Sequence, residues 1–77
     1  MGIKIRAFGK LAEITGKSEW EWSGIDQLDE LKSRLHADFP GLDSKMYVLA
    51  VNRQVVSENI NMEEGAEVAL LPPFSGG

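Results

Sequence analysis

SGIDQLDELKSRLHADFPG, from Ser23 to Gly41, is the one long helical segment that the sequence predicts. Ser23 can act as its N-cap, and Asp26 three residues later resembles a capping box with Asp in place of Glu. Pro40 and Gly41 end the helix. The apolar residues recur at steps of three and four and so form one stripe, made of Ile25, Leu28, Leu31, Leu35 and Phe39. A helix with one apolar stripe must bury that stripe on a sheet.

The segments on both sides of this helix predict strands. Five short stretches are apolar or alternate between apolar and polar residues: 3–8, 18–22, 47–51, 54–56 and 67–71. Asn52 and Arg53 can form a two-residue turn, because Asn tolerates positive φ. Residues 11–15 form a short helical turn at best. We therefore expect an α+β domain in which one main helix packs on one face of a mixed sheet of four to five strands.

Length and composition limit the class of protein. The 77 residues suit one small domain, so residues 1–77 are expected to form a single unit. The absence of cysteine excludes thiolate metal sites and a cysteine nucleophile, and it fits a cytoplasmic protein. The net charge of −4 argues against nucleic acid as a partner. The longest apolar run, residues 47–51, is too short to cross a membrane, and the first residues lack the apolar stretch of a signal peptide.

The alternation along the strands predicts an apolar patch on the sheet face that the helix leaves uncovered. If Val68 and Leu70 share the core with the first strand, Leu71 must point out of the sheet. Phe8 points out by the same argument, and so does either Val55 or Val56. A contiguous exposed patch of this kind marks a partner surface. The alternative is that the strand ends close over these residues.

The chain finishes with Leu70-Leu71-Pro72-Pro73-Phe74-Ser75-Gly76-Gly77, in which the last strand gives way to a flexible tail at residues 73–77. Glycine has no Cβ, so a Gly-Gly end can be threaded into a narrow active site where any side chain would clash. Pro72 and Pro73 limit backbone freedom at the base of the tail, which lowers the cost of ordering it. The terminal carboxylate is therefore a candidate reacting group.

Other residues with possible chemistry favour structural roles. Trp20 and Trp22 are expected to cover the core or a sheet edge, since their neighbours are acidic and a base-stacking platform needs a positive groove. His36 has no second histidine or cysteine with which to bind a metal. Lys4 and Arg6 share a strand face with Phe8, and we hypothesise that they pair with acidic groups on a partner.

The pattern as a whole resembles the ubiquitin-like sulfur carriers, and most of all the small subunits of molybdopterin synthase. The Pro-Pro-hydrophobic-Ser-Gly-Gly ending at residues 72–77 is the most specific match. Further matches are Phe8 before the turn at 11–16, and residues 50–52 and 65–68. Ala66 departs from the family, in which Asp is common, but this affects a turn and not the chemistry. The resemblance covers essentially the whole chain and implies the β-grasp fold.

The resemblance also implies a chemistry. In the family a partner enzyme adenylates the terminal carboxylate with ATP, and a sulfur donor converts it to a thiocarboxylate. Carried over, Gly77 would become a 1-thioglycine and donate sulfur to the pterin precursor in molybdenum cofactor biosynthesis, with Gly76 completing the thin end of the tail. No cofactor would be bound permanently, and the chain would have no complete active site of its own. The implied partner-binding residues are Phe8, Val55, Leu71, Pro72, Pro73, Phe74 and Ser75.

Two partners follow from the resemblance. One is a ubiquitin-activating-like adenylyltransferase, and the other is the large catalytic subunit of the synthase, in a heterotetramer of two small and two large subunits. Alternatives stay open. A carrier for thiamine or tRNA thiolation would need the same tail, and so would a protein modifier that forms an isopeptide bond through Gly77. A passive ubiquitin-like binding module would not need the terminal glycines.

Overall fold

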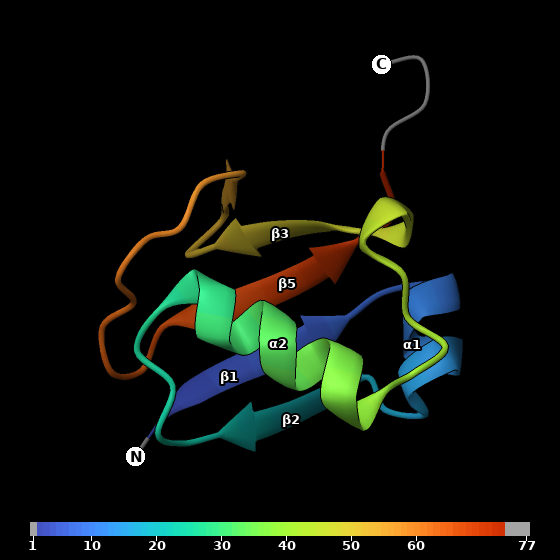
Figure 1. Cartoon of the computed structure of the whole chain (residues 1–77), viewed down its shortest axis with the longest axis horizontal. Coiled ribbons are helices and arrows are strands. Elements are labelled where there is room, and N and C mark those ends of the chain that lie inside the picture. The colour runs from blue at the N-terminus through green and yellow to red at the C-terminus, as the bar shows by residue number, and fades with distance from the viewer. Residues whose placement is uncertain (1, 74–77) are drawn as a thin grey trace.

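The computed structural model describes residues 2–73 (Figure 1). Its five strands form one sheet with the order β2-β1-β5-β3-β4. β1 and β5 are parallel, whereas the other neighbouring pairs are antiparallel, so the sheet is mixed as predicted. In chain order the elements are β1 (Ile3–Ala7), α1 (Lys10–Thr15), β2 (Glu19–Trp22), α2 (Leu28–Asp38), η1 (Ser44–Met46), β3 (Val48–Val51), β4 (Gln54–Val56) and β5 (Glu67–Leu71).

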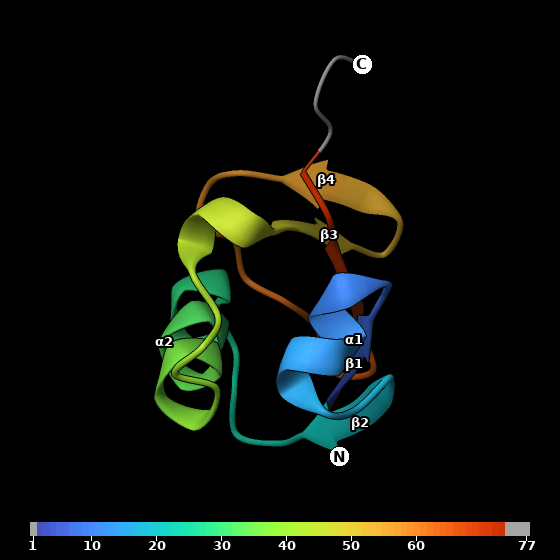
Figure 2. The ribbon, with the colours of Figure 1, turned by 90° about the vertical axis from the view of Figure 1, so that its right-hand side faces the viewer.

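The α2 helix crosses one face of the sheet, and the core lies between the two layers (Figures 1 and 2). Leu28, Leu31 and Leu35 of the predicted stripe are completely buried. They face Ile5 and Leu70, which are completely buried on the central strands β1 and β5. This helix stripe and this sheet face form the centre of the core, to which residues outside them, such as Leu11, Leu42 and Met62, also contribute. Among residues 2–73, no helix is long and apolar enough to cross a membrane.

The predicted start of the main helix was wrong. Ser23 and Asp26 do not cap it, because the helix begins at Leu28 with Gln27 as N-cap and Glu30 closing the capping box. The Glu30 carboxylate accepts hydrogen bonds from the backbone N–H groups of Gln27 and Asp26, at 3.1 and 3.2 Å. Gly24 has a φ of 80°, so the chain still turns at this point and cannot yet be helical.

The first turn of α2 is completed by a segment that lies about thirty residues later in the sequence. The Ile60 carbonyl accepts a hydrogen bond from the Leu28 N–H at 3.0 Å, and the Asn59 side chain accepts one from the Asp29 N–H at 2.9 Å. These are N–H groups that a helix cannot satisfy by itself. The connection between β4 and β5 therefore fixes where α2 begins.

Residues 10–15 form a helix of six residues, α1, which is more than the short turn that the sequence predicted. Leu11 anchors it in the core with 2% of its surface exposed. The Thr15 hydroxyl bonds to the Leu11 carbonyl at 3.0 Å, and Gly16 ends the helix with a φ of 76°. The predicted hairpin turn is confirmed, since Asn52 and Arg53 have φ values of 50° and 72°.

Candidate functional site

The sheet face opposite α2 carries short apolar side chains at its centre. In the strand register, Ala50 of β3 lies between Ala69 of β5 and Val55 of β4. Two residues along these strands, on the same face, Val48 lies beside Leu71. Because side chains on neighbouring strands at one register position share a face, these five residues all face away from the core. Two alanines in the middle leave the face hollow there.

This hollow, which we call the open-face hollow, has a volume of about 400 Å³. Three of the residues that the family resemblance assigns to partner binding line it together: Phe8, Val55 and Leu71. Phe8 and Val55 are 44% and 61% exposed, large values for apolar side chains, and Leu71 is half-buried. The complete lining is Arg6, Phe8, Ala50, Arg53, Val55, Glu67, Val68, Ala69 and Leu71.

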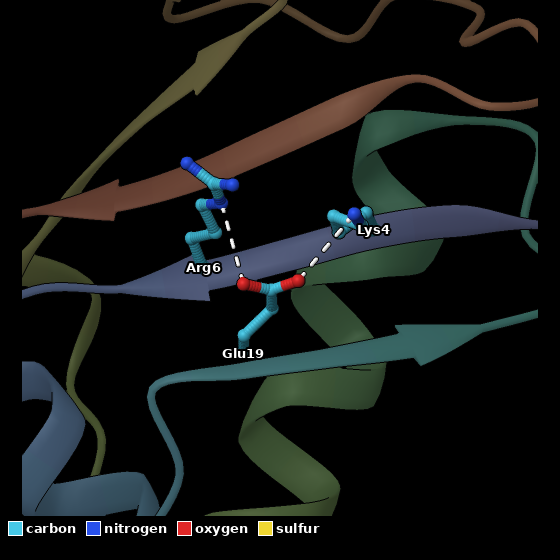
Figure 3. Close-up of polar contacts among 3 residues, drawn as sticks. All are labelled: Lys4, Arg6 and Glu19. Atoms are coloured by element: carbon cyan, nitrogen blue, oxygen red, sulfur yellow. Dashed lines mark ion pairs between the residues drawn. The ribbon is translucent and has the colours of Figure 1, made fainter.

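Charged side chains stand beside the apolar ones. Glu19 of β2 lies between Lys4 and Arg6 of β1, with N–O distances of 3.4 and 3.6 Å (Figure 3). All three side chains are between 37% and 47% exposed, so these ion pairs are open to solvent. Arg53 reaches the hollow from the turn between β3 and β4. The sequence pattern indicates a surface role for Lys4 and Arg6 but not for Arg53, Ala50 or Ala69. Strand pairing brings the two alanines to the hollow, and the turn between β3 and β4 brings Arg53 there.

The root of the tail directly follows β5, the strand that contributes Leu71 to the open-face hollow. Pro72 and Pro73 are exposed and directly follow Leu71 of the hollow. They line a second, smaller hollow of about 240 Å³ together with Lys10, Leu11, Ile14 and Met46. The predicted tail residues Phe74, Ser75, Gly76 and Gly77 lie outside the described residues. β5 thus connects the open-face hollow directly to Pro72 and Pro73.

The remaining chemical residues have structural contacts. Trp20 and Trp22 are half-buried and pack against Phe39 after α2, with ring centroids 5.6 and 6.2 Å from its ring, so they cover the core as predicted. His36 Nε2 lies 2.9 Å from the Tyr47 hydroxyl oxygen. Burial raises the pKa of Tyr47 above 10.0, and the nearby Asp43 carboxylate adds to the shift. Within residues 2–73 no group of three or more acidic, histidine or cysteine residues could hold a metal ion.

Comparison with known proteins agrees with this architecture. The family model described as "ThiS family" matches residues 5–77. This chain belongs to the ThiS family. Its relatives include a molybdopterin synthase sulfur carrier subunit of Chlamydomonas reinhardtii, which is 35% identical over the full length of both chains.

Solved structures of ThiS-like proteins share the fold. A protein described as molybdopterin converting factor, subunit 1, from Pyrococcus furiosus superposes with a TM-score of 0.84 at 18% identity, covering 96% of this chain and 99% of the other. The complex of subunits 1 and 2 of the molybdopterin-converting factor from Helicobacter pylori contains a chain with a TM-score of 0.75 at 24% identity and full coverage of both. Small archaeal modifier protein 1 of Methanosarcina acetivorans gives a TM-score of 0.80 at 20% identity, covering 97% and 95%. At these identities the likeness shows the β-grasp fold alone.

Proposed function

We propose that this ThiS-family chain is the sulfur carrier subunit of a molybdopterin synthase and that it carries sulfur as a thiocarboxylate on Gly77. The observation that carries the proposal is the position of Leu71. Leu71 lines the open-face hollow, and the next residues, Pro72 and Pro73, begin the tail. When a partner docks on the hollow, the first residue of the tail therefore has a fixed position relative to that partner. The full-length similarity to a named sulfur carrier subunit supports the same function.

The proposed chemistry begins with a carboxylate, which is a poor electrophile because its charge is spread over both oxygens. Attack of the Gly77 carboxylate on the α-phosphate of ATP forms an acyl-adenylate and releases pyrophosphate. A sulfur nucleophile from a donor then attacks the carbonyl carbon, AMP leaves, and a thiocarboxylate remains. Its sulfur is a soft nucleophile that attacks an electrophilic carbon of the pterin precursor and displaces an oxygen leaving group, so that the acyl group is joined to the pterin through sulfur. Water then cleaves the acyl–sulfur bond and regenerates the carboxylate, so the carrier acts as a covalent catalyst.

Each part of the chain has a place in this scheme. The apolar side chains Phe8, Val55 and Leu71 provide docking area, whose burial contributes roughly 25 cal/mol per Å². Pro72 and Pro73 restrict the base of the tail, so less entropy is lost when it enters an active site. Gly76 and Gly77 lack side chains and suit a narrow channel.

Two partners are part of the proposal. The adenylyltransferase supplies the ATP site, and the large subunit of the synthase supplies the pterin pocket and the acid–base groups. One chain of the Helicobacter pylori complex of subunits 1 and 2 shares this fold, and this supports the large subunit as a partner. We propose a heterotetramer of two small and two large subunits in the cytoplasm.

Intact mass spectrometry tests this function. The chain is mixed with the activating enzyme of its own cell, ATP and a sulfide source. We expect a mass increase equal to one exchange of oxygen for sulfur, mapped by fragmentation to Gly77. A variant extended by one alanine after Gly77 is the control, and it should stay unchanged while remaining folded. Sulfur transfer by the extended chain would contradict the proposal, and lysine-linked conjugates in its place would indicate a protein modifier.

A second assay separates the pathways. The thiocarboxylated chain is added to the large subunit and the pterin precursor, and molybdopterin formation is measured. Product formation supports the synthase assignment. A carrier that is thiocarboxylated but gives no product with the large subunit would instead belong to thiamine or tRNA thiolation.

A further inference from the structure

We propose that the large subunit places an apolar side chain in the open-face hollow and a carboxylate against Arg6, and that this carboxylate takes the place of Glu19. The inference rests on the proposed function, because it specifies the chemistry of that partner at the same face. It makes Arg6 a specificity-determining residue and Glu19 an internal competitor for it. The geometry, the charge balance and the effect of desolvation each support it.

Arg6 has the right position. It lies on β1 opposite Ala69 of β5 and lines the hollow. Its ion pair with Glu19 involves Nε, which lies 3.6 Å from a carboxylate oxygen, and Figure 3 shows the end of the guanidinium extending toward β5. Among residues 2–73 it has no ion pair with a second acidic residue. A partner carboxylate can therefore reach the guanidinium from the side of the hollow and displace Glu19, and the fork of N–H donors suits that group.

The contact between Arg6 and Glu19 is easily exchanged. Glu19 is shared with Lys4, so one carboxylate serves two cations. The side chains of Arg6 and Glu19 are 46% and 47% exposed, and ion pairs in such surroundings contribute about 0–1 kcal/mol. A partner carboxylate can take over Arg6 while Glu19 keeps Lys4. The ion pair that is lost between Arg6 and Glu19 is then replaced by one to the partner, so the total number at this site stays at two.

Docking changes the surroundings of Arg6. An apolar side chain that fills the hollow expels water, and a guanidinium deprived of water needs a paired anion. The hollow is lined by two cations, Arg6 and Arg53, and one anion, Glu67, although the chain as a whole carries a net charge of −4. Its lining therefore has one excess positive charge. A partner that supplies an acidic group beside its apolar one complements this lining, and a basic partner does not.

Titration calorimetry of this chain with the large subunit tests the exchange. Arg6→Gln should weaken binding at least about fivefold and flatten its dependence on salt, because a charge-assisted contact is lost. Glu19→Gln should tighten binding severalfold, because the internal competitor is removed. The matched control is Arg34→Gln, which changes the net charge equally. Arg34 forms an exposed ion pair of 3.5 Å with Asp38 on α2, away from the open face, so its loss should leave affinity unchanged. Thermal unfolding of each variant verifies that the fold is kept.

The outcomes separate this inference from the proposed function. If Arg6→Gln binds as tightly as Arg34→Gln, no partner carboxylate uses Arg6 and the inference is wrong. If Glu19→Gln weakens binding or leaves it unchanged, the exchange is wrong, because Glu19 then does not compete. In both cases binding of the wild type leaves the proposed function standing. If the wild type itself does not bind the large subunit, the proposed partner is wrong and the inference falls with it.

Discussion

Leu70 and Leu71 are adjacent in the sequence but lie on opposite faces of β5. Leu70 is completely buried under α2, whereas Leu71 is half-buried and lines the open-face hollow. The same residue type thus serves the core in one position and the surface in the next, because side chains alternate along a strand. The two leucines therefore form a matched pair that separates stability from docking.

Truncating Leu70 to alanine should mainly lower stability, whereas truncating Leu71 to alanine should mainly weaken binding to the large subunit. Leu70→Ala leaves a cavity in the core and should lower the free energy of unfolding by about 2–5 kcal/mol. Leu71→Ala should cost about 1 kcal/mol or less but weaken binding to the large subunit, because it removes apolar docking area. Urea unfolding and calorimetry measure the two effects. Equal losses of stability in both variants would mean that Leu71 belongs to the core.

The faces of the strands could be predicted because period-two alternation is a local property. Val68, Leu70 and Leu71 lie where the pattern places them, and so do Phe8 and Val55. The register between strands carries no such local signal. The alanines at positions 50 and 69 that make the hollow, and Arg53 beside them, therefore emerged only from the structure.

The start of α2 could not be predicted for a similar reason. Ser23 and Asp26 form a plausible local cap, whereas Gln is an uncommon N-cap residue. The structure favours Gln27 because Asn59 and Ile60, far away in the sequence, bind the first N–H groups of the helix. Long-range hydrogen bonds overrode the local preference.

The backbone of Trp22 and Ser23 packs so closely against Gly2 that no side chain fits at this position. A Cβ on Gly2 would overlap the backbone carbonyl oxygen of Trp22 and lie 2.8 Å from the Cα of Ser23. Both are backbone atoms, one in β2, which pairs with β1, and one in the residue directly after β2, so they cannot move aside as a flexible side chain could. Gly2→Ala should therefore lower the free energy of unfolding by about 1–3 kcal/mol.

Gly41→Ala is the control for this effect. A Cβ there would meet only Ile14 Cγ2 at 3.8 Å, an ordinary van der Waals contact. Its stability should equal or slightly exceed that of the wild type, since alanine restricts the unfolded chain. Thermal unfolding compares the two variants, and equal melting temperatures would refute the predicted overlap.

Tyr47 should make stability depend on pH under alkaline conditions. Its pKa is raised by burial and by Asp43, so the unfolded chain, with a tyrosine pKa of 10.0, loses this proton first. The contribution of neutral Tyr47 is fully present below pH 10.0 and is lost as the pH rises through the folded-state pKa. Tyr47→Phe keeps the ring but cannot ionise. The stability difference between wild type and variant should therefore fall as the pH rises from 10.0 to the folded-state pKa of Tyr47.

Two measurements check the behaviour of Tyr47. Urea unfolding at a series of pH values gives the stability difference, which would stay constant if the folded and unfolded pKa values were equal. The chain has one tyrosine, so an absorbance titration of the native protein follows Tyr47 alone. Its midpoint should lie above that of the unfolded protein.

Arg53 has a backbone conformation that is unfavourable for an L residue, and its side chain places a positive charge at the open-face hollow. It has a φ of 72°, a conformation that favours glycine, and yet it lines the open-face hollow. An Asn-Gly pair is the preferred sequence for a two-residue hairpin turn of this kind. Arg53→Gly should therefore raise the free energy of unfolding by up to about 1 kcal/mol, because an L side chain in this region costs about that much. The same variant should bind the large subunit more weakly and more slowly, because a cation beside the hollow is lost.

Arg53→Asn separates the charge from the turn. Asparagine tolerates positive φ, so this variant should keep wild-type stability or slightly exceed it while losing the cation. If the charge matters, Arg53→Asn and Arg53→Gly should show the same loss of association rate at low salt, and the loss should shrink as salt screens the interaction. Stopped-flow mixing with the large subunit measures these rates. Wild-type rates in both variants would show that the large subunit does not use Arg53 and that the strained turn has no role in docking.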